Sequence, residues 1–425
     1  MINRPDYIAA IEPFIDKPLV KILAGIRRCG KSTIFEMLRE ELLRRGIGED
    51  QIICKRYTEM DIPENITAKQ MYDELTAAMA GKGHCYLLLD EIQEITGWEK
   101  TVNSLLESAD ADIYVTGSNS KLMSSEISTY LTGRYVSIPV YTLSFKEYLD
   151  FKADSTLSRR ELLEEYIRFG GFPIIALSEY DEQSAYQIVN GIYHTVVSRD
   201  IVKRHRINKQ DLFDRVVKYI IENMGKTFSA NAISTFLKSE HRKVSVESIY
   251  NYLRWLEQAF IIYPCERYDL QGKSILKTQE KYYLADVSLK YALLGYNRKM
   301  LDGAMENIVF LELKRRGYDV YIGKNDTKEM YDYLGEKSRI KKLDDAFKME
   351  HSNFRIVIVV DMWITGFDVP CLTYLYNDKP LQKQTLIQTI SRVNRKYPHK
   401  EYGYIIDYIG IHDNMMEAMG RYGGG

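Results

Sequence analysis

The chain has 425 residues, of which 45% are hydrophobic and 28% are charged, and its formal net charge is -1. This length allows about two to four domains, and the balanced charge means that a nucleic acid must be met by a local basic face. Five scattered cysteines without a CxxC pair argue against a disulfide framework or a zinc knuckle. No uncharged apolar run approaches the roughly 20 residues of a membrane span, so we expect a cytoplasmic protein with no membrane partner.

The first predicted elements surround a phosphate-binding loop. The run "VKILAG" has strand character, "GIRRCGKS" matches G-x-x-x-x-G-K-[ST], and the helical periodicity of "TIFEMLREELLRRG" ends at Gly46. In this context backbone N–H groups and the helix N-terminus bind phosphates, so we expect Lys31 to reach the β and γ phosphates of ATP and Ser32 to hold Mg²⁺. The nucleotide-binding residues predicted here are Gly25, Arg28, Cys29, Gly30, Lys31, Ser32 and Thr33.

A second strand is expected to complete this site. In "CYLLLDEIQEI" four apolar residues precede Asp90 and Glu91, as in a buried parallel strand whose carboxyl end faces a ligand. We expect Asp90 to hold Mg²⁺ through water and Glu91 to polarise the attacking water as a general base. An Asp-Glu pair after an apolar strand is common by itself. Together with the loop upstream, it predicts ATP hydrolysis.

Two more candidate residues follow the next predicted strand, residues 112–116. Asn119 lies in the polar run after that strand, where such ATPases place a sensor of the γ phosphate. Arg134 follows a turn glycine and is a candidate catalytic cation for the charge of the transition state; the alternative is a solvated surface arginine. If Arg134 acts on a neighbouring copy, the site requires an oligomer.

Beyond residue 150 the sequence predicts mainly helices. The basic cluster in "YHTVVSRDIVKRHRI" is either a patch facing nucleotide or DNA, or a solvated helix face. Residues 211–268 have the pattern helix, turn, helix and strand pair, with Ser229 and Ser245 as helix caps. This pattern is typical of a winged helix, which contacts double-stranded DNA or a protein partner. The second helix carries little positive charge on its outer face, so both partners stay open.

Several of these motifs carry a family resemblance. In this order, "GIRRCGKS", "LLLDEIQ" with Trp98, "TGSNS", "LTGRY", "LSFKEYL" and "YIRFGGFP" resemble bacterial and archaeal AAA-type ATPases with a C-terminal domain of unknown function. The resemblance covers about residues 1–323. It implies an ATP-binding domain, a winged-helix segment and a restriction-endonuclease-like domain. In the last of these, a helix with Glu306 and Glu312 is expected to lead into the strand 319–323. The strand expected after Glu329 is missing, so we interpret this domain as truncated and inactive as a nuclease. The alternative is that Asp332 takes the acidic role in a shifted register.

The end of the chain carries a second resemblance. "FRIVIVVDMWITGFDVPCLTYLYNDKPL" and "LIQTISRVNRKYPHKEYGYIIDYIGI" resemble the second motor domain of the restriction subunit of type I restriction enzymes, over about residues 331–425. The resemblance implies that Arg392 and Arg395 reach phosphates bound by a first motor domain, which the sequence lacks. We therefore interpret the chain as a fusion made near residues 324–331, with a helicase fragment that does not act as a motor. The alternative is a new architecture in which the half-motor contacts DNA.

The expected fold class is α/β. The predicted order is a P-loop AAA-type ATPase domain (1–150), a helical linker region (151–210), a winged-helix-like domain (211–268), a truncated endonuclease-like segment (269–330) and a RecA-like helicase fragment (331–425). The expected function is an AAA-type ATPase with ATP and Mg²⁺ at its site. Two alternatives stay open: a DNA-binding regulator that responds to ATP, and a component of a restriction or helicase-type DNA translocase.

Overall fold

The computed structural model divides the chain into two units, which are described separately. The first unit comprises Met1–Cys265 and Gln279–Val320, and the second comprises Glu266–Thr278 and Tyr321–Gly425. The structure describes residues 3–58, 66–123, 130–131, 133–207, 209–226, 228–239, 244–266, 280–296, 303–321, 369–377, 383–398, 400 and 402–407.

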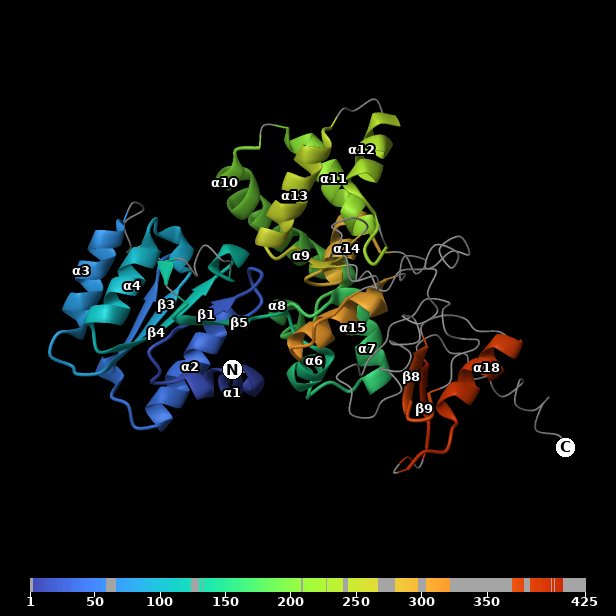
Figure 1. Cartoon of the computed structure of the whole chain (residues 1–425), viewed down its shortest axis with the longest axis horizontal. Coiled ribbons are helices and arrows are strands. Elements are labelled where there is room, and N and C mark those ends of the chain that lie inside the picture. Colours follow the sequence, from blue (N-terminus) through green and yellow to red (C-terminus); the bar gives the residue numbers. More distant parts are fainter. Residues whose placement is uncertain are drawn as a thin grey trace, which may run out of the picture. The chain divides into compact units, whose positions relative to one another are not determined.

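A five-stranded parallel sheet organises the beginning of the first unit (Figure 1). Its strands are β1 (Val20–Ala24), β2 (Ile52–Arg56), β3 (Cys85–Asp90), β4 (Ala111–Gly117) and β5 (Tyr135–Pro139), in the order β2-β3-β4-β1-β5. β1 and β3 are buried along their whole length, as their apolar runs predict for a parallel sheet covered on both faces. The register pairs Leu23 with Thr116 and Leu89 with Val115. The carboxyl ends of β1, β3 and β4 therefore lie at one edge of the sheet.

Helices cover both faces of this sheet. They are α1 (Pro5–Ile11), α2 (Lys31–Arg44), α3 (Ala68–Met79) and α4 (Trp98–Ser108), with short 3₁₀ turns η1 (Glu12–Phe14), η2 (Glu49–Gln51), η3 (Ile92–Glu94) and η4 (Ser120–Met123). Because connections between parallel strands are right-handed, the strand order places α2 on one face and α3 and α4 on the other (Figure 1). The predicted stop of α2 is confirmed, since Gly46 follows it with a φ of 89°.

The rest of the first unit is mainly helical. Its helices are α6 (Phe145–Phe151), α7 (Arg159–Phe169), α8 (Pro173–Ala176), α9 (Glu182–Val196), the π-helix η5 (Val197–Val202), α10 (Lys203–His205), α11 (Gln210–Glu222), α12 (Ala230–Ser239), α13 (Val246–Gln258), α14 (Ser288–Leu294) and α15 (Ala304–Arg315). β6 (Ile262–Cys265) and β7 (Lys281–Leu284) form an antiparallel pair. Both predicted caps are confirmed, because the hydroxyls of Ser229 and Ser245 accept hydrogen bonds from backbone N–H groups at 3.1 and 3.0 Å.

One predicted strand of this unit is wrong in its described part. Residues 319–321 form no strand, although the helix expected before them is present as α15. The carbonyl of Val320 accepts a hydrogen bond from the Cys265 thiol at 3.4 Å. The backbone groups of a strand need hydrogen-bond partners on a neighbouring strand. Here the carbonyl of Val320 has the side chain of Cys265 as a partner instead. Residues 322 and 323 lie outside the described part of the chain.

The described part of the second unit contains β8 (Tyr374–Asn377), α18 (Lys383–Val393) and β9 (Tyr404–Asp407). β8 and β9 are parallel, and the rings of Tyr374 and Tyr404 stack on one another at 5.0 Å. A helix between two parallel strands is the connection expected for a motor-domain fragment. Most of the predicted run "IVIVVDMWITGFDVP" lies outside the described residues.

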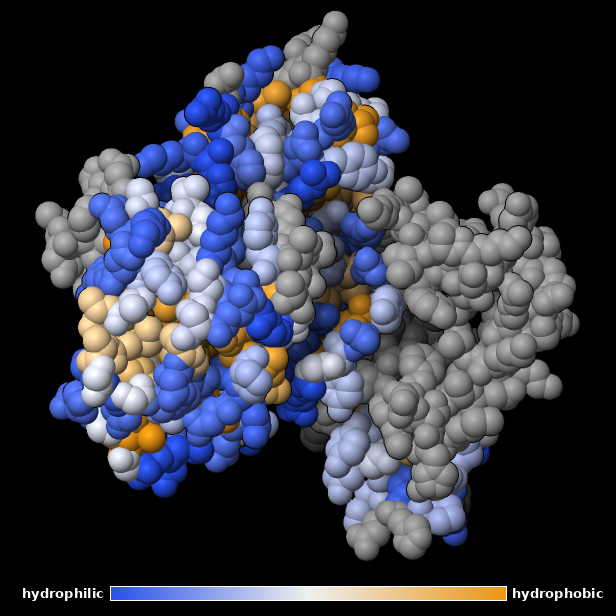
Figure 2. Space-filling view, turned by 60° about the vertical axis from the view of Figure 1, so that its left-hand side comes forward, coloured by the Kyte–Doolittle hydropathy of each residue, from blue (hydrophilic) through white to orange (hydrophobic). Residues whose placement is uncertain are grey.

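Hydrophilic side chains predominate on the face of the molecule drawn in Figure 2, with hydrophobic ones scattered among them. Within the described ranges, no helix is both long enough and apolar enough to cross a membrane. The predicted α/β class is confirmed by the parallel sheet and its helices.

Candidate nucleotide site

The predicted phosphate loop connects β1 to α2 at the sheet edge where β3 and β4 also end. A side chain is impossible at Gly25, because a Cβ there would lie 1.9 Å from the carbonyl oxygen of Val140. Gly30 caps α2 with a φ of 103°, a conformation that favours glycine. Lys31 is 4% exposed, and its ammonium donates to the Gly25 and Ile26 carbonyls at 2.9 and 3.2 Å. The loop thus holds the buried ammonium of Lys31 against its own backbone carbonyls.

Asp90 lies at the end of β3, opposite the first turn of α2. The Ser32 hydroxyl donates to the Asp90 carboxylate at 2.7 Å, and the Thr116 hydroxyl on β4 donates to its other oxygen. Arg56 at the end of β2 also donates to this carboxylate, at 3.1 Å. The structure therefore brings together the two predicted metal ligands, Ser32 and Asp90, and it adds two neighbours that hold the carboxylate in place.

Glu91 has a left-handed backbone, with a φ of 55°, which is unusual for a residue with a side chain. Its N–H donates to the Thr116 hydroxyl at 3.0 Å. One carboxylate oxygen accepts hydrogen bonds from Gln93 and from Ser118, while the other lies 3.8 Å from the Lys31 ammonium. The strained backbone therefore directs a buried carboxylate toward the phosphate loop.

The remaining predicted nucleotide-binding residues have different surroundings. Asn119 is 2% exposed and follows β4 at the same sheet edge. Cys29 belongs to the loop and its side chain is buried, and this burial raises the pKa of its thiol. Arg28 has a φ of 70°, and its side chain is exposed, as is that of Thr33. Arg28 therefore has a position on the loop, and Thr33 has a position in the first turn of α2.

Arg134 is the one predicted catalytic residue that the structure does not bring to this site. It precedes β5, and its carbonyl accepts from the Val20 N–H at the start of β1. Since β1 and β5 are parallel, Arg134 lies at the opposite edge of the sheet from the loop. Its guanidinium contacts Asn103 and Glu107 at 2.9 and 2.6 Å. The prediction that Arg134 acts at the nucleotide site of its own chain is therefore wrong. Its action on a neighbouring copy stays a prediction.

Arg27 is a residue of the loop that the sequence did not single out. Its guanidinium lies 3.6 Å from the carboxylate of Asp200 on η5, and 3.9 and 4.0 Å from those of Glu94 and Glu91. Arg199 on the same π-helix also pairs with Glu94, at 3.5 Å. The basic cluster predicted around residue 199 is thus joined to the site through carboxylates. No sequence pattern indicates this, because the two segments are far apart along the chain.

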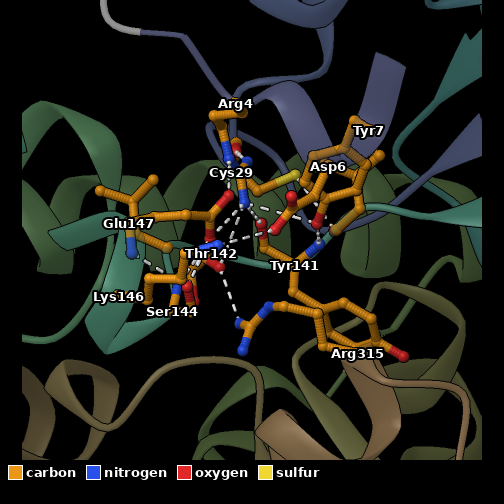
Figure 3. Close-up of polar contacts among 12 residues, drawn as sticks. Arg4, Asp6, Tyr7, Cys29, Tyr141, Thr142, Ser144, Lys146, Glu147 and Arg315 are labelled. Carbon is orange, nitrogen blue, oxygen red and sulfur yellow. Dashed lines mark hydrogen bonds and ion pairs between the residues drawn. The ribbon is translucent and has the colours of Figure 1, made fainter. Parts of the chain in front are cut away.

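A second missed residue, Arg4, contacts the backbone of the loop (Figure 3). Its side chain is 2% exposed and makes two hydrogen bonds to the Glu147 carboxylate, at 2.6 and 3.2 Å. It also donates to the carbonyls of Cys29 at 2.9 Å and Tyr141 at 3.1 Å. Because Cys29 belongs to the loop, this arginine fixes part of the loop backbone to the segment that follows β5.

Another arginine reaches the same segment from α15. Arg315 donates to the carbonyl of Thr142 at 3.0 Å, and its guanidinium lies 5.5 Å from the centre of the Tyr141 ring (Figure 3). α15 is the helix that the sequence assigned to the endonuclease-like segment. Through Arg315 it contacts the segment after β5 that Arg4 joins to the phosphate loop.

The acidic residues assigned to the endonuclease-like segment have other partners. The Glu306 carboxylate accepts from the Lys281 ammonium and the Tyr283 hydroxyl, both at 2.6 Å. Glu312 pairs with Arg315 and Arg316 on its own helix, at 2.6 and 2.7 Å. Within the described residues, no group of three histidine, cysteine or carboxylate side chains is arranged to hold a metal ion.

Comparison with family models divides the chain into three matches. Residues 17–149 match an AAA domain, residues 160–299 a domain of unknown function (DUF8612), and residues 309–410 domain 3 of the type I restriction enzyme subunit R. The predicted resemblances to AAA-type ATPases and to the restriction subunit are confirmed.

Two relatives match the chain over most of its length. An uncharacterised protein of Haemophilus influenzae is 36% identical over 341 residues, which is 80% of this chain and 84% of that protein. An uncharacterised protein of Methanocaldococcus jannaschii is 30% identical over 387 residues, 86% of this chain and 84% of that protein. The chain belongs to the family of these two proteins, and its first part is an AAA domain.

Other similarities are more restricted. A protein of M. jannaschii named as a type I restriction endonuclease subunit is 42% identical over 97 residues, 23% of this chain but only 9% of that subunit. Among solved structures, an Aeropyrum pernix Orc1 protein in complex with DNA has a TM-score of 0.31 and 14% identity, covering 73% of this chain and 92% of that one. A superposition at this TM-score is loose, so the family assignment comes from the sequence matches.

Proposed function

We propose that the chain is a Mg²⁺-dependent ATPase whose site combines the phosphate loop with the carboxyl ends of β3 and β4. The main support is the meeting of Ser32 with Asp90 at 2.7 Å and of Lys31 with Glu91 at 3.8 Å. These groups come from the turn after β1 and from the end of β3, and ligands of open α/β sheets bind at this edge. The match to an AAA domain supports the same assignment.

Ser32 and Asp90 have the chemistry that Mg²⁺ requires. This ion prefers oxygen ligands and is usually held by one or two carboxylates together with water and phosphate oxygens. The Ser32 hydroxyl and the Asp90 carboxylate are adjacent oxygens, and Thr116 orients the carboxylate from β4. When bound there, Mg²⁺ would neutralise charge on the phosphates of ATP.

Lys31 and Glu91 would carry the hydrolysis. Lys31 would bind the terminal phosphates in exchange for the loop carbonyls that it now contacts. Glu91 would accept a proton from a water molecule while the oxygen of that water bonds to the γ phosphorus of ATP. The bond between the γ phosphorus and the oxygen that leaves with ADP would break in the same step. Gln93 and Ser118 hold one oxygen of Glu91, which fixes the direction of the other.

DNA contact is a second candidate function. α11, α12 and α13 followed by β6 and β7 have the element order of a winged helix, which supports the expectation from the sequence. Lys238 at the end of α12 is exposed. The other predicted basic residues between α12 and α13 lie at positions 241–243, outside the described part of the chain. Duplex DNA would then change the rate of ATP hydrolysis, or ATP hydrolysis would change the affinity for DNA.

The test is ATP hydrolysis by the purified full chain with Mg²⁺, with and without duplex DNA. We expect Lys31→Ala to abolish nucleotide binding and hydrolysis. Glu91→Gln should keep binding but slow hydrolysis by about 100-fold or more, because a general base contributes about that much. Stimulation by DNA that weakens as salt is added would support the second candidate. Hydrolysis by Lys31→Ala at the normal rate would reject the proposed site.

A further inference from the structure

Arg27 has an unusual environment for a partly buried arginine. Its side chain is 13% exposed, and within the described residues its Nε and Nη2 atoms have no hydrogen-bond partner. Three carboxylates surround it at 3.6 to 4.0 Å, which is beyond the range of about 2.7–3.2 Å for an N–H···O hydrogen bond. Buried N–H groups without an acceptor are costly, so this guanidinium is suited to an additional anion.

The position of Arg27 identifies the kind of anion. Arg27 and Lys31 lie on the same loop, and both contact the Glu91 carboxylate, at 4.0 and 3.8 Å. A phosphate that displaces Glu91 from Lys31 would therefore meet Arg27 as well. The planar guanidinium donates two parallel hydrogen bonds to a phosphate, which a lysine ammonium does not. The chemistry thus favours a phosphoryl group in the terminal position of a nucleotide.

Asp200 orients this arginine from another part of the chain. It belongs to η5, beyond the residues that match the AAA domain, and its side chain is 6% exposed. Its Oδ2 atom faces the Arg27 Nε at 3.6 Å and has no hydrogen-bond partner among the described residues. Since a buried carboxylate requires a cation, the two side chains hold each other in place. Arg27 is thereby kept beside Lys31.

We propose that Arg27 binds the terminal phosphate of a nucleoside triphosphate and that Asp200 is its positioning residue. This inference rests on the proposed nucleotide site and adds to it a residue that distinguishes triphosphate from diphosphate. It also connects the bound nucleotide to η5, and through Arg199 to the basic cluster that follows.

Binding of ATP and of ADP, each with Mg²⁺, tests this inference by titration calorimetry on the full chain. Arg27→Ala should weaken ATP binding at least about tenfold, as expected for the loss of a charged hydrogen bond, and change ADP binding by less than about twofold. Asp200→Asn should weaken ATP binding in the same selective way but less strongly. In the double variant, Asp200→Asn should not weaken ATP binding beyond the effect of Arg27→Ala, because both changes act through the same guanidinium.

The matched control is Arg44→Ala, which removes an exposed arginine of α2 whose guanidinium pairs with Glu41 on the same helix. It should leave both affinities unchanged. Equal losses for ATP and ADP in Arg27→Ala, or no loss in a folded variant, would overturn the inference while leaving the ATPase site intact. If Arg27→Ala does not fold, the selective loss in Asp200→Asn decides the question. Wild-type protein that binds neither nucleotide would instead reject the proposed function, and this inference with it.

Discussion

Glu147 is a buried acid whose charge is stabilised mainly by one arginine. Burial raises the pKa of Glu147, but the hydrogen bonds and charge of Arg4 outweigh this effect, so the pKa lies below its usual value of 4.5. An acid with a lowered pKa in the folded state stabilises the fold above its unfolded pKa. That contribution is lost as the pH falls through the folded pKa.

We expect Glu147→Gln to destabilise the first unit at pH 7 by about 3 kcal/mol, because Arg4 is left buried without a counter-charge. The difference from wild type should shrink as the pH falls below 4.5, where Glu147 of the unfolded wild-type chain begins to bind a proton, and it should vanish as the pH passes the lower pKa of the folded state. Urea unfolding followed by tryptophan fluorescence at several pH values measures both effects. The matched control is Glu164→Gln, an exposed partner of Arg160, which should cost less than about 1 kcal/mol at any pH. A pH-independent difference at position 147 would contradict this account.

Residue by residue, the sequence predicted the parts of the site that one local motif defines. Lys31 and Ser32 lie in a continuous run whose backbone geometry the glycines dictate, so their positions could be predicted. Arg27 and Asp200 are 173 positions apart by their numbers in the sequence, and only the packing of η5 brings them together. Arg134 was singled out as a cation that follows a turn glycine, but the direction of β5 carries it to the other sheet edge.

Among the elements, α7 ends at a glycine that no other residue can replace without strain. Gly170 has a φ of 75°, and a Cβ there would lie 1.8 Å from the Asp286 carboxylate. We expect Gly170→Ala to lower the free energy of unfolding by at least about 2 kcal/mol through backbone strain and overpacking. The measurement is the urea midpoint of the full chain.

Gly191 in α9 is the matched control for this change. A Cβ at this position would have no atom within 4 Å, and the residue lies in the interior of a helix. Gly191→Ala should therefore stabilise the helix by about 0.5–1 kcal/mol. A similar decrease in both variants would show that the Asp286 contact is not the cause.

The elements that the sequence predicted well are those with a strong local signal. Buried parallel strands appear as apolar runs, and helices α2, α12 and α13 have recognisable caps or stops. The strand expected at 319–323 was implied only by the family resemblance, and its described residues, 319–321, form no strand. Whether such a segment pairs depends on a neighbouring strand, which a local pattern cannot supply.

For the whole molecule, the main question is whether the second unit takes part in nucleotide hydrolysis. Arg392 lies on α18, in the part that resembles a restriction-enzyme motor. If the phosphate loop works alone, Arg392→Ala should leave the hydrolysis rate within about twofold of wild type, whereas Lys31→Ala abolishes it. Loss in both variants, together with stimulation by DNA, would favour the alternative of a DNA translocase component. The assay is steady-state phosphate release.

The contacts of Arg4 have a consequence for how the protein is made. Its carboxylate partner is 143 residues further along the chain. A ribosome that adds about 5–20 residues per second needs roughly 7–30 seconds to synthesise that interval. Residue 315, whose guanidinium holds the same segment from α15, is made later still. The phosphate loop therefore emerges early but gains its full support late, and a nascent chain halted before residue 147 would carry the nucleotide motif without the side chains that shape it.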